Sequence, residues 1–236
     1  QSQYYMCQID FHHKDYARVI SLGESLLSDE VNQYFAPEIH RLVGESYYHQ
    51  GNPQKARTHL NTYVTTTEEP IMRSASYALG VMDFDAADHS AAIEHLSQVT
   101  GVSDELAQSA LLYLGQTYLK TGDNKLAALA FEKASSMDFN REVKEHAFYN
   151  YAVCQSKGSA TPFGNDIELF ETFLNEFPTS KLKTNVEQHL VHAYLTTNNY
   201  DRALASIENI KNPSATILKA KQNVLYNLGV QAMQKG

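Results

Sequence analysis

Apolar and small residues recur along the chain at the spacing of amphipathic helices. In residues 113–134, Ala127, Phe131 and Ala134 follow one another at steps of four and three, which places them on one face of a helix. The turn sequence TGDN precedes them, with a glycine that can end one helix and an aspartate that can cap the next. The pattern therefore predicts two helices joined by a tight turn.

The two-helix pattern repeats through the chain. Its marker is a large apolar residue followed by a small one inside the first helix. The small residues are Cys7, Gly44, Gly80, Gly115, Ala152, Val191 and Gly229. The steps between them, by subtraction, are 37, 36, 35, 37, 39 and 38 residues. So regular a spacing predicts a repeat protein. A glycine costs about 1 kcal/mol in a helix interior, and we interpret its recurrence as room for a neighbouring helix to pack close.

Turn residues and prolines divide the pattern into pairs of helices. The predicted hairpins cover residues 1–29, 37–69, 73–100, 104–138, 142–178 and 180–213, and a last helix covers 216–235. One turn is predicted to be lengthened, at residues 156–166 with the sequence SKGSATPFGND. The expected fold class is all-α with thirteen helices in a single array over residues 1–236. Because the chain lacks an initiator methionine and its last helix is apolar, we expect a fragment of a longer protein.

The same residues resemble the tetratricopeptide repeat. Its motif matches Leu114, Gly115, Tyr118, Gly122, Ala127, Phe131 and Ala134, and matches again at Val43, Gly44, Tyr47, Gly51 and Ala56. Asp83 and Gln155 depart from it, because they replace the aromatic residue of the first helix. The resemblance implies a right-handed α-α superhelix that binds a protein or peptide partner in its concave groove and has no catalytic activity.

Two segments resemble a narrower group within the tetratricopeptide repeat proteins. FETFLNEFPTS at 170–180 and HLVHAYLTTNNYDRALASI at 189–207 are similar to repeats of bacterial cell-envelope tetratricopeptide proteins. This similarity favours a periplasmic or cell-envelope location over a cytoplasmic one. It also leaves open an alternative function, in which the array is a structural spacer or an oligomerisation module, such as a homodimer, within a larger multidomain protein.

The expected binding surface is one stripe along the first helices. Positions six and three before each small residue, and one, four and five after it, lie within an arc of about 100°. The resemblance implies that this stripe lines the groove. The expected groove residues are Arg41, Glu45, Tyr48, Tyr77, Phe84, Gln116, Lys120, Tyr149, His192 and Tyr226. Tyrosine combines a large contact area with a hydrogen-bonding tip, although any single tyrosine could instead pack against a neighbouring second helix.

Charge and hydropathy exclude two classes of partner. The net charge of -8 disfavours nucleic acid, which is held through clustered lysine and arginine. The chain contains no run of 18 apolar residues, so we expect no direct membrane span.

Catalytic and metal-binding motifs are also lacking in the sequence. We find no phosphate loop and no nucleophile elbow. His189 and His192 are three residues apart, whereas a zinc helix needs two histidines four apart and a third ligand. Cys7 and Cys154 are predicted to be free, buried residues. We therefore expect no enzyme activity, no cofactor and no bound metal.

Overall fold

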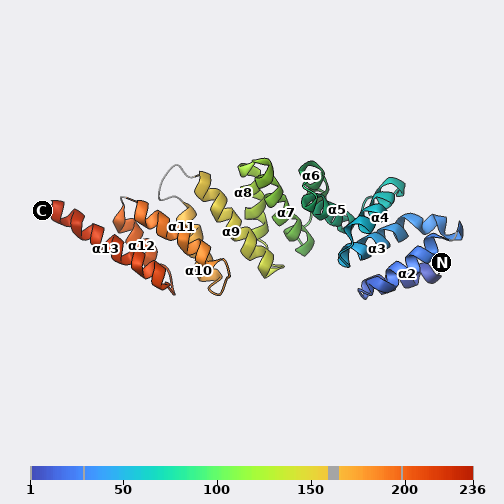
Figure 1. Cartoon of the computed structure of the whole chain (residues 1–236), viewed down its shortest axis with the longest axis horizontal. Helices are drawn as coiled ribbons and strands as arrows, with labels where there is room; N and C mark the ends of the chain where they lie inside the picture. Colours follow the sequence, from blue (N-terminus) through green and yellow to red (C-terminus); the bar gives the residue numbers. More distant parts are fainter. Residues whose placement is uncertain (1, 29, 159–164, 198, 236) are drawn as a thin grey trace. The chain divides into compact units, whose positions relative to one another are not determined.

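The computed structural model describes residues 2–28, 30–158, 165–197 and 199–235. Within these residues the chain forms thirteen α-helices, one short 3-10 helix and no strand, which confirms the predicted all-α class (Figure 1). Residues 159–164 of the predicted long turn lie outside the described residues. None of the described helices is long and apolar enough to cross a membrane.

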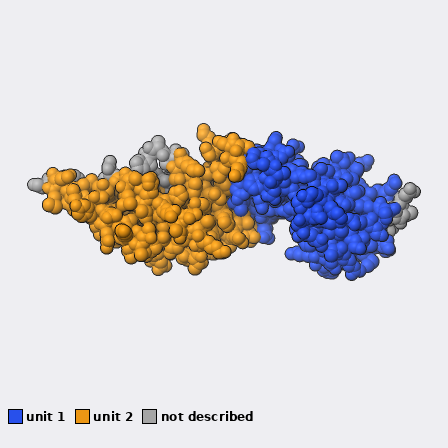
Figure 2. Space-filling model, viewed as in Figure 1, with its two compact units in different colours: residues 1–117 blue, residues 118–236 orange. Residues whose placement is uncertain are grey.

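The chain divides into two compact units, residues 1–117 and 118–236 (Figure 2). Unit 1 contains α1 (Ser2–His12), α2 (Tyr16–Leu27), η1 (Glu30–Phe35), α3 (Ala36–His49), α4 (Pro53–Thr66), α5 (Arg73–Asp85) and α6 (His89–Ser97). Unit 2 contains α8 (Asn124–Ser135), α9 (Arg141–Gly158), α10 (Asn165–Glu176), α11 (Lys183–Thr196), α12 (Tyr200–Glu208) and α13 (Ala215–Lys235). The boundary between the two units falls within α7 (Glu105–Thr121). The single array over residues 1–236 stays a prediction.

The turn inside each of four helix pairs has the same construction. One or two residues after the first helix ends, the backbone is left-handed, with φ of 61° at Lys14, 73° at Gly51, 59° at Ala87 and 85° at Gly122. The next residue is an aspartate or asparagine whose side chain accepts a hydrogen bond from the backbone N–H three residues later. This side chain satisfies one of the free amides that begin every helix. The turn therefore starts the second helix at a fixed residue.

Close packing inside a pair depends on the small residue of its first helix. A Cβ added at Gly44 would lie 2.8 Å from Leu60 Cγ, and one added at Gly80 would lie 2.6 Å from Leu96 Cγ. The interpretation of these glycines as packing sites is therefore confirmed at both positions. At Gly229 nothing lies within 4 Å of the added Cβ, and no second helix follows α13 in the described residues, so the interpretation stays a prediction there.

Each unit has a core of apolar side chains from both helices of its pairs. In unit 1 the core includes Val19, Ile39 and Leu60, and in unit 2 it includes Phe173 and Leu190. Cys7 and Cys154 are free and buried, as predicted.

The residue three positions after the small one connects three helices through polar contacts. In unit 1 the Tyr47 hydroxyl on α3 donates to Glu24 on α2 at 2.5 Å and accepts from Lys55 on α4 at 2.9 Å. Asp83 on α5 is 2% exposed, and its carboxylate accepts from Arg57 on α4 at 2.6 Å and hydrogen-bonds His95 on α6 at 2.7 Å. Asp83 replaces the aromatic residue of the motif, yet it still links the second helices of two successive pairs, α4 and α6.

Replacing Gly80 with alanine tests the close packing of a pair. The added methyl group would lie 2.6 Å from Leu96 Cγ, so that α5 and α6 must separate or Leu96 must move. We expect Gly80→Ala to lower the free energy of unfolding by about 1–3 kcal/mol, measured by urea denaturation followed by circular dichroism.

Gly229→Ala is the matched control, because the same register position in α13 has open space around the added Cβ. There the higher helix propensity of alanine should raise the free energy of unfolding by about 0.5–1 kcal/mol. A Gly80→Ala variant as stable as the parent chain would contradict the packing role.

Candidate functional site

Four aromatic side chains from three first helices gather in unit 1. Tyr48 lies on α3, Tyr77 and Phe84 on α5, and Tyr113 on α7, and we call them the aromatic patch. The ring centroids of Tyr77 and Tyr113 are 6.3 Å apart at an interplanar angle of 74°, and those of Phe84 and Tyr113 are 5.4 Å apart at 71°. Both pairs have the edge-to-face geometry that aromatic rings favour. All four side chains are half-buried, so part of each ring stays exposed to solvent.

The hydroxyl groups of the patch are held in their neutral form. Burial raises the pKa of Tyr48 to about 12, with smaller contributions from Tyr113 and Asp85. Burial and then Asp85 also raise the pKa of Tyr113. The pKa of Tyr77 is raised by burial, by Tyr48 and by Tyr113, and its hydroxyl hydrogen-bonds the side chain of Ser109. The patch can therefore offer an apolar surface together with neutral donors and acceptors.

Arg41 and Glu45, also expected in the groove, are buried and paired. The Arg41 guanidinium donates to Glu45 at 2.9 Å and to both oxygens of Glu38 at 2.5 and 2.9 Å. The Ser74 hydroxyl on α5 donates to the same Glu45 oxygen at 2.8 Å. This cluster connects α3 to α5. Breaking it would leave a buried charge without a partner, so the cluster stabilises the packing of α3 on α5.

The other expected groove residues differ in their surroundings. Gln116 is half-buried on α7, and Lys120, His192 and Tyr226 are exposed on α7, α11 and α13. Tyr149 on α9 is half-buried against Phe173 at 6.2 Å and His189 at 6.4 Å. These contacts favour the packing role for Tyr149. The structure thus brings Tyr48, Tyr77 and Phe84 together, while the four expected residues from Lys120 onward belong to unit 2.

Tyr113 was missing from the predicted stripe. It lies two residues before Gly115, which at about 100° per residue puts it about 20° beyond the edge of the predicted arc. A slightly wider arc would have included it. An aromatic residue at the edge of a polar stripe therefore indicates a further residue of the same surface.

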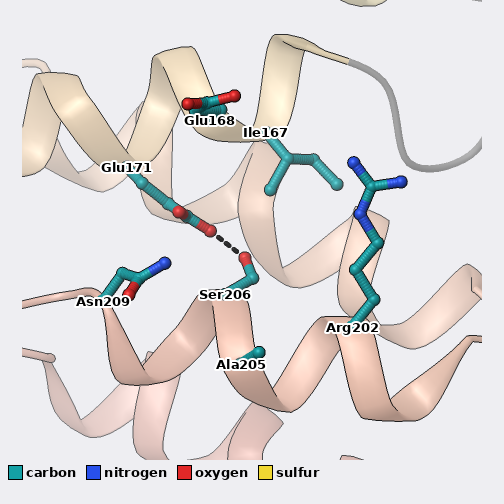
Figure 3. Close-up of a pocket in the computed structure, with 7 residues that line it drawn as sticks. All are labelled: Ile167, Glu168, Glu171, Arg202, Ala205, Ser206 and Asn209. Atoms are coloured by element: carbon teal, nitrogen blue, oxygen red, sulfur yellow. Dashed lines mark hydrogen bonds between the residues drawn. The ribbon is translucent and has the colours of Figure 1, made fainter.

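A second candidate is a pocket of about 210 Å³ between α10 and α12 in unit 2 (Figure 3). Its central group is Glu171, which is 6% exposed and accepts a hydrogen bond from the Ser206 hydroxyl. The Tyr194 hydroxyl on α11 lies 3.2 Å from the Glu171 carboxylate and 3.0 Å from Ser206 Oγ. Figure 3 shows the carboxylate of Glu171 directed at Ser206, and the guanidinium of Arg202 directed towards Ile167.

The chemistry of this pocket is that of a buried proton site. Burial raises the pKa of Glu171 to about 7, and the hydrogen bonds from Tyr194 and Asn209 act in the opposite direction. Ser206 is itself buried and donates its hydroxyl proton to the carboxylate, so both groups lie inside the fold. We interpret the cluster as a structural link between α10, α11 and α12.

Histidines do not form a metal site in the described part of the chain. His189 is half-buried and stacks on Phe170 with ring centroids 4.9 Å apart, whereas His192 is exposed. Across the described residues, no group of three or more histidine, cysteine, aspartate and glutamate side chains is placed to hold a metal ion.

The raised pKa of Glu171 predicts how stability depends on pH. Because the folded chain holds this proton more tightly than the unfolded chain, its stabilising effect is complete below pH 4.5 and is lost as the pH rises to about 7. We expect a loss on the order of 3 kcal/mol between pH 5 and pH 8, measured by urea denaturation. Glu171→Gln should largely remove this loss.

Glu168→Gln on the same helix is the control, because Glu168 is exposed and is the smallest of the influences on the pKa of Glu171, so that most of the pH dependence should stay. If Glu171→Gln and the parent chain lost the same stability between the two pH values, the proton site would be elsewhere.

Comparisons with known proteins agree with this fold. Residues 77–137 match the family model described as tetratricopeptide repeat. A crystal structure of a tetratricopeptide repeat protein from Parabacteroides merdae has a TM-score of 0.56 at 16% identity, covering 95% of this chain and 86% of that one. The C-terminal part of a repeat-containing protein from Cytophaga hutchinsonii has a TM-score of 0.44 at 14% identity, covering 92% and 98%. The search of curated proteins found no match.

The comparisons support the general class of repeat protein more than the predicted cell-envelope location or a specific partner. Tetratricopeptide repeat proteins are typically non-catalytic scaffolds, and their repeats generally mediate protein–protein interactions. The matches contain nothing specific to the cell envelope. Residues 77–137 thus match the tetratricopeptide repeat model, and the chain has an all-α fold similar to that of a solved tetratricopeptide repeat protein.

Proposed function

We propose that this chain is a non-catalytic scaffold whose unit 1 binds a segment of a protein partner on the aromatic patch. The observation that supports the proposal is the convergence of Tyr48, Tyr77, Phe84 and Tyr113 from three helices into one half-exposed cluster. Aromatic residues with partly exposed rings are the usual anchors of protein interfaces. The neutral tyrosine hydroxyls can bond the backbone of a bound segment without adding charge.

The cluster beside the patch supports the same proposal. The Arg41–Glu45 pair and the hydrogen bond from Ser74 hold α3 and α5 together in the free chain. A surface whose helices are already fixed loses less conformational entropy when a partner binds. We therefore assign Arg41 and Glu45 to positioning and the aromatic rings to contact.

The remaining groove residues extend the proposal beyond the patch. Gln116 follows Tyr113 on α7, and Lys120 follows on the same helix. In unit 2, Tyr149, His192 and Tyr226 belong to the same predicted stripe on α9, α11 and α13. We propose Gln116 as a further contact beside the patch, and Lys120, His192, Tyr226 and the exposed part of Tyr149 as contacts that unit 2 makes by itself.

Selection of binding peptides tests this function. We expect peptides selected from a random display library against the whole chain to bind the double variant Tyr77→Ala/Phe84→Ala at least about tenfold more weakly than the parent, because the variant removes two aromatic anchors. Affinity is measured by fluorescence anisotropy, and circular dichroism checks that the variant is folded.

Tyr5→Ala provides the matched control. Tyr5 is an aromatic residue of unit 1 that is 50% exposed on α1, outside the patch, and its loss should leave affinity unchanged. Equal binding by the parent and the double variant would move the site elsewhere. A dimer in light scattering that dissociates on Tyr77→Ala would replace partner binding with self-association.

A further inference from the structure

A hollow in unit 1 is lined by residues that do not belong to the aromatic patch. It has a volume of about 570 Å³ and lies between α1, η1, the start of α3 and the segment that follows α4. This volume is within the range of about 300–1,000 Å³ that is usual for ligand pockets. The hollow has no role in the function proposed above.

One side of the hollow is aromatic. Tyr4 and Phe35 stack with ring centroids 4.4 Å apart at an interplanar angle of 20°, and Tyr34 meets Phe35 at 5.1 Å and 87°. Tyr34 is 88% exposed, although it is a large aromatic residue. Met72, which is 50% exposed, adds a flexible apolar group to the lining.

The lining of the hollow is also acidic. Glu38, Glu68 and Glu69 line the hollow, and its lining residues include no lysine, arginine or histidine. Glu38 is already bonded to Arg41, whereas Glu68 and Glu69 are exposed at the rim. The surface therefore has an uncompensated negative charge beside exposed aromatic rings.

The rim is held in place by hydrogen bonds. The Tyr63 hydroxyl accepts from the backbone N–H of Met72 at 3.1 Å, and Tyr63 is only 2% exposed. Thr67 Oγ1 accepts from the backbone N–H of Glu69 at 3.2 Å. Both ends of the segment that carries the two exposed glutamates are thus tied to the fold.

A basic side chain fits this combination better than other occupants. An anion would meet the exposed carboxylates of Glu68 and Glu69, and a purely apolar group would desolvate them without a partner. Lysine and arginine have an apolar stem and a cation, so that the stem can lie on rings while the cation reaches a carboxylate. We propose that this hollow binds a basic segment of a protein partner, with one lysine or arginine stem on Tyr34 and Phe35 and its cation at Glu68 and Glu69.

Nuclear magnetic resonance of the whole ¹⁵N-labelled chain tests the site with small probes. The probes are the N-acetyl methylamides of lysine and arginine, and the controls are those of norleucine and glutamate. We expect saturable shifts of the backbone amides of residues 34–38 and 66–72 with both basic probes only. Raising the salt to 0.5 M should weaken them, because at least one carboxylate is exposed.

Two variants test the assigned residues. The exposed pair Glu68→Gln/Glu69→Gln should weaken binding of the lysine and arginine probes by about three- to tenfold, since each exposed ion pair contributes modestly. Tyr34→Ala should weaken binding of both basic probes as well. Because Tyr34 is 88% exposed, the variant should keep the fold. Glu94→Gln, an exposed glutamate on α6, is the matched control and should change nothing.

Three outcomes would overturn the proposal. They are the absence of saturable shifts at tens of millimolar probe, equal binding of norleucine, and unchanged affinity in the double glutamine variant. The Tyr77→Ala/Phe84→Ala variant should bind the lysine probe normally, so failure of this site and failure of the aromatic patch are separate results.

Discussion

The approach of a leucine to a glycine inside two helix pairs, α3 with α4 and α5 with α6, is the constraint on which the rest of unit 1 depends. At Gly44 and Gly80 the site of a missing Cβ lies 3.1 Å from the backbone nitrogen of Leu60 or Leu96, and such closeness allows one register between the two helices. Because that register fixes the rotation of the first helix, it also decides which residues face away from the second. Tyr48, Tyr77 and Phe84 follow from this rotation, four residues after or three before a glycine.

A second rule concerns the polar position three residues after the small one. Tyr47, Asp83 and Tyr194 differ in size and charge, yet each brings an oxygen between its own second helix and the preceding one. The fold requires a polar atom there more than it requires an aromatic ring. The partners change accordingly, with Arg57 and His95 around a carboxylate and with Glu171 and Ser206 around a phenol.

The helices and their register were predictable because one weak pattern, a large apolar residue followed by a small one, occurs seven times at nearly constant spacing. The burial of individual groove residues could not be predicted. Arg41 and Glu45 are buried through their contacts with Glu38 and Ser74, and Ser74 meets Glu45 only when α5 packs on α3. The acidic hollow was missed for another reason. One of its walls is η1, which lies in the stretch left between the first two predicted hairpins and has no helical periodicity to reveal it.

The turns at Lys14 and Ala87 adopt the same left-handed backbone as those at Gly51 and Gly122, although only glycine adopts it without strain. The cap that follows, Asp15 or Asp88, and the packing of the two helices hold the turn in place. Turn geometry in this chain is therefore inherited from the pair and not encoded by one residue. A search that required glycine at this position would count two of these four hairpins and underestimate the number of repeats.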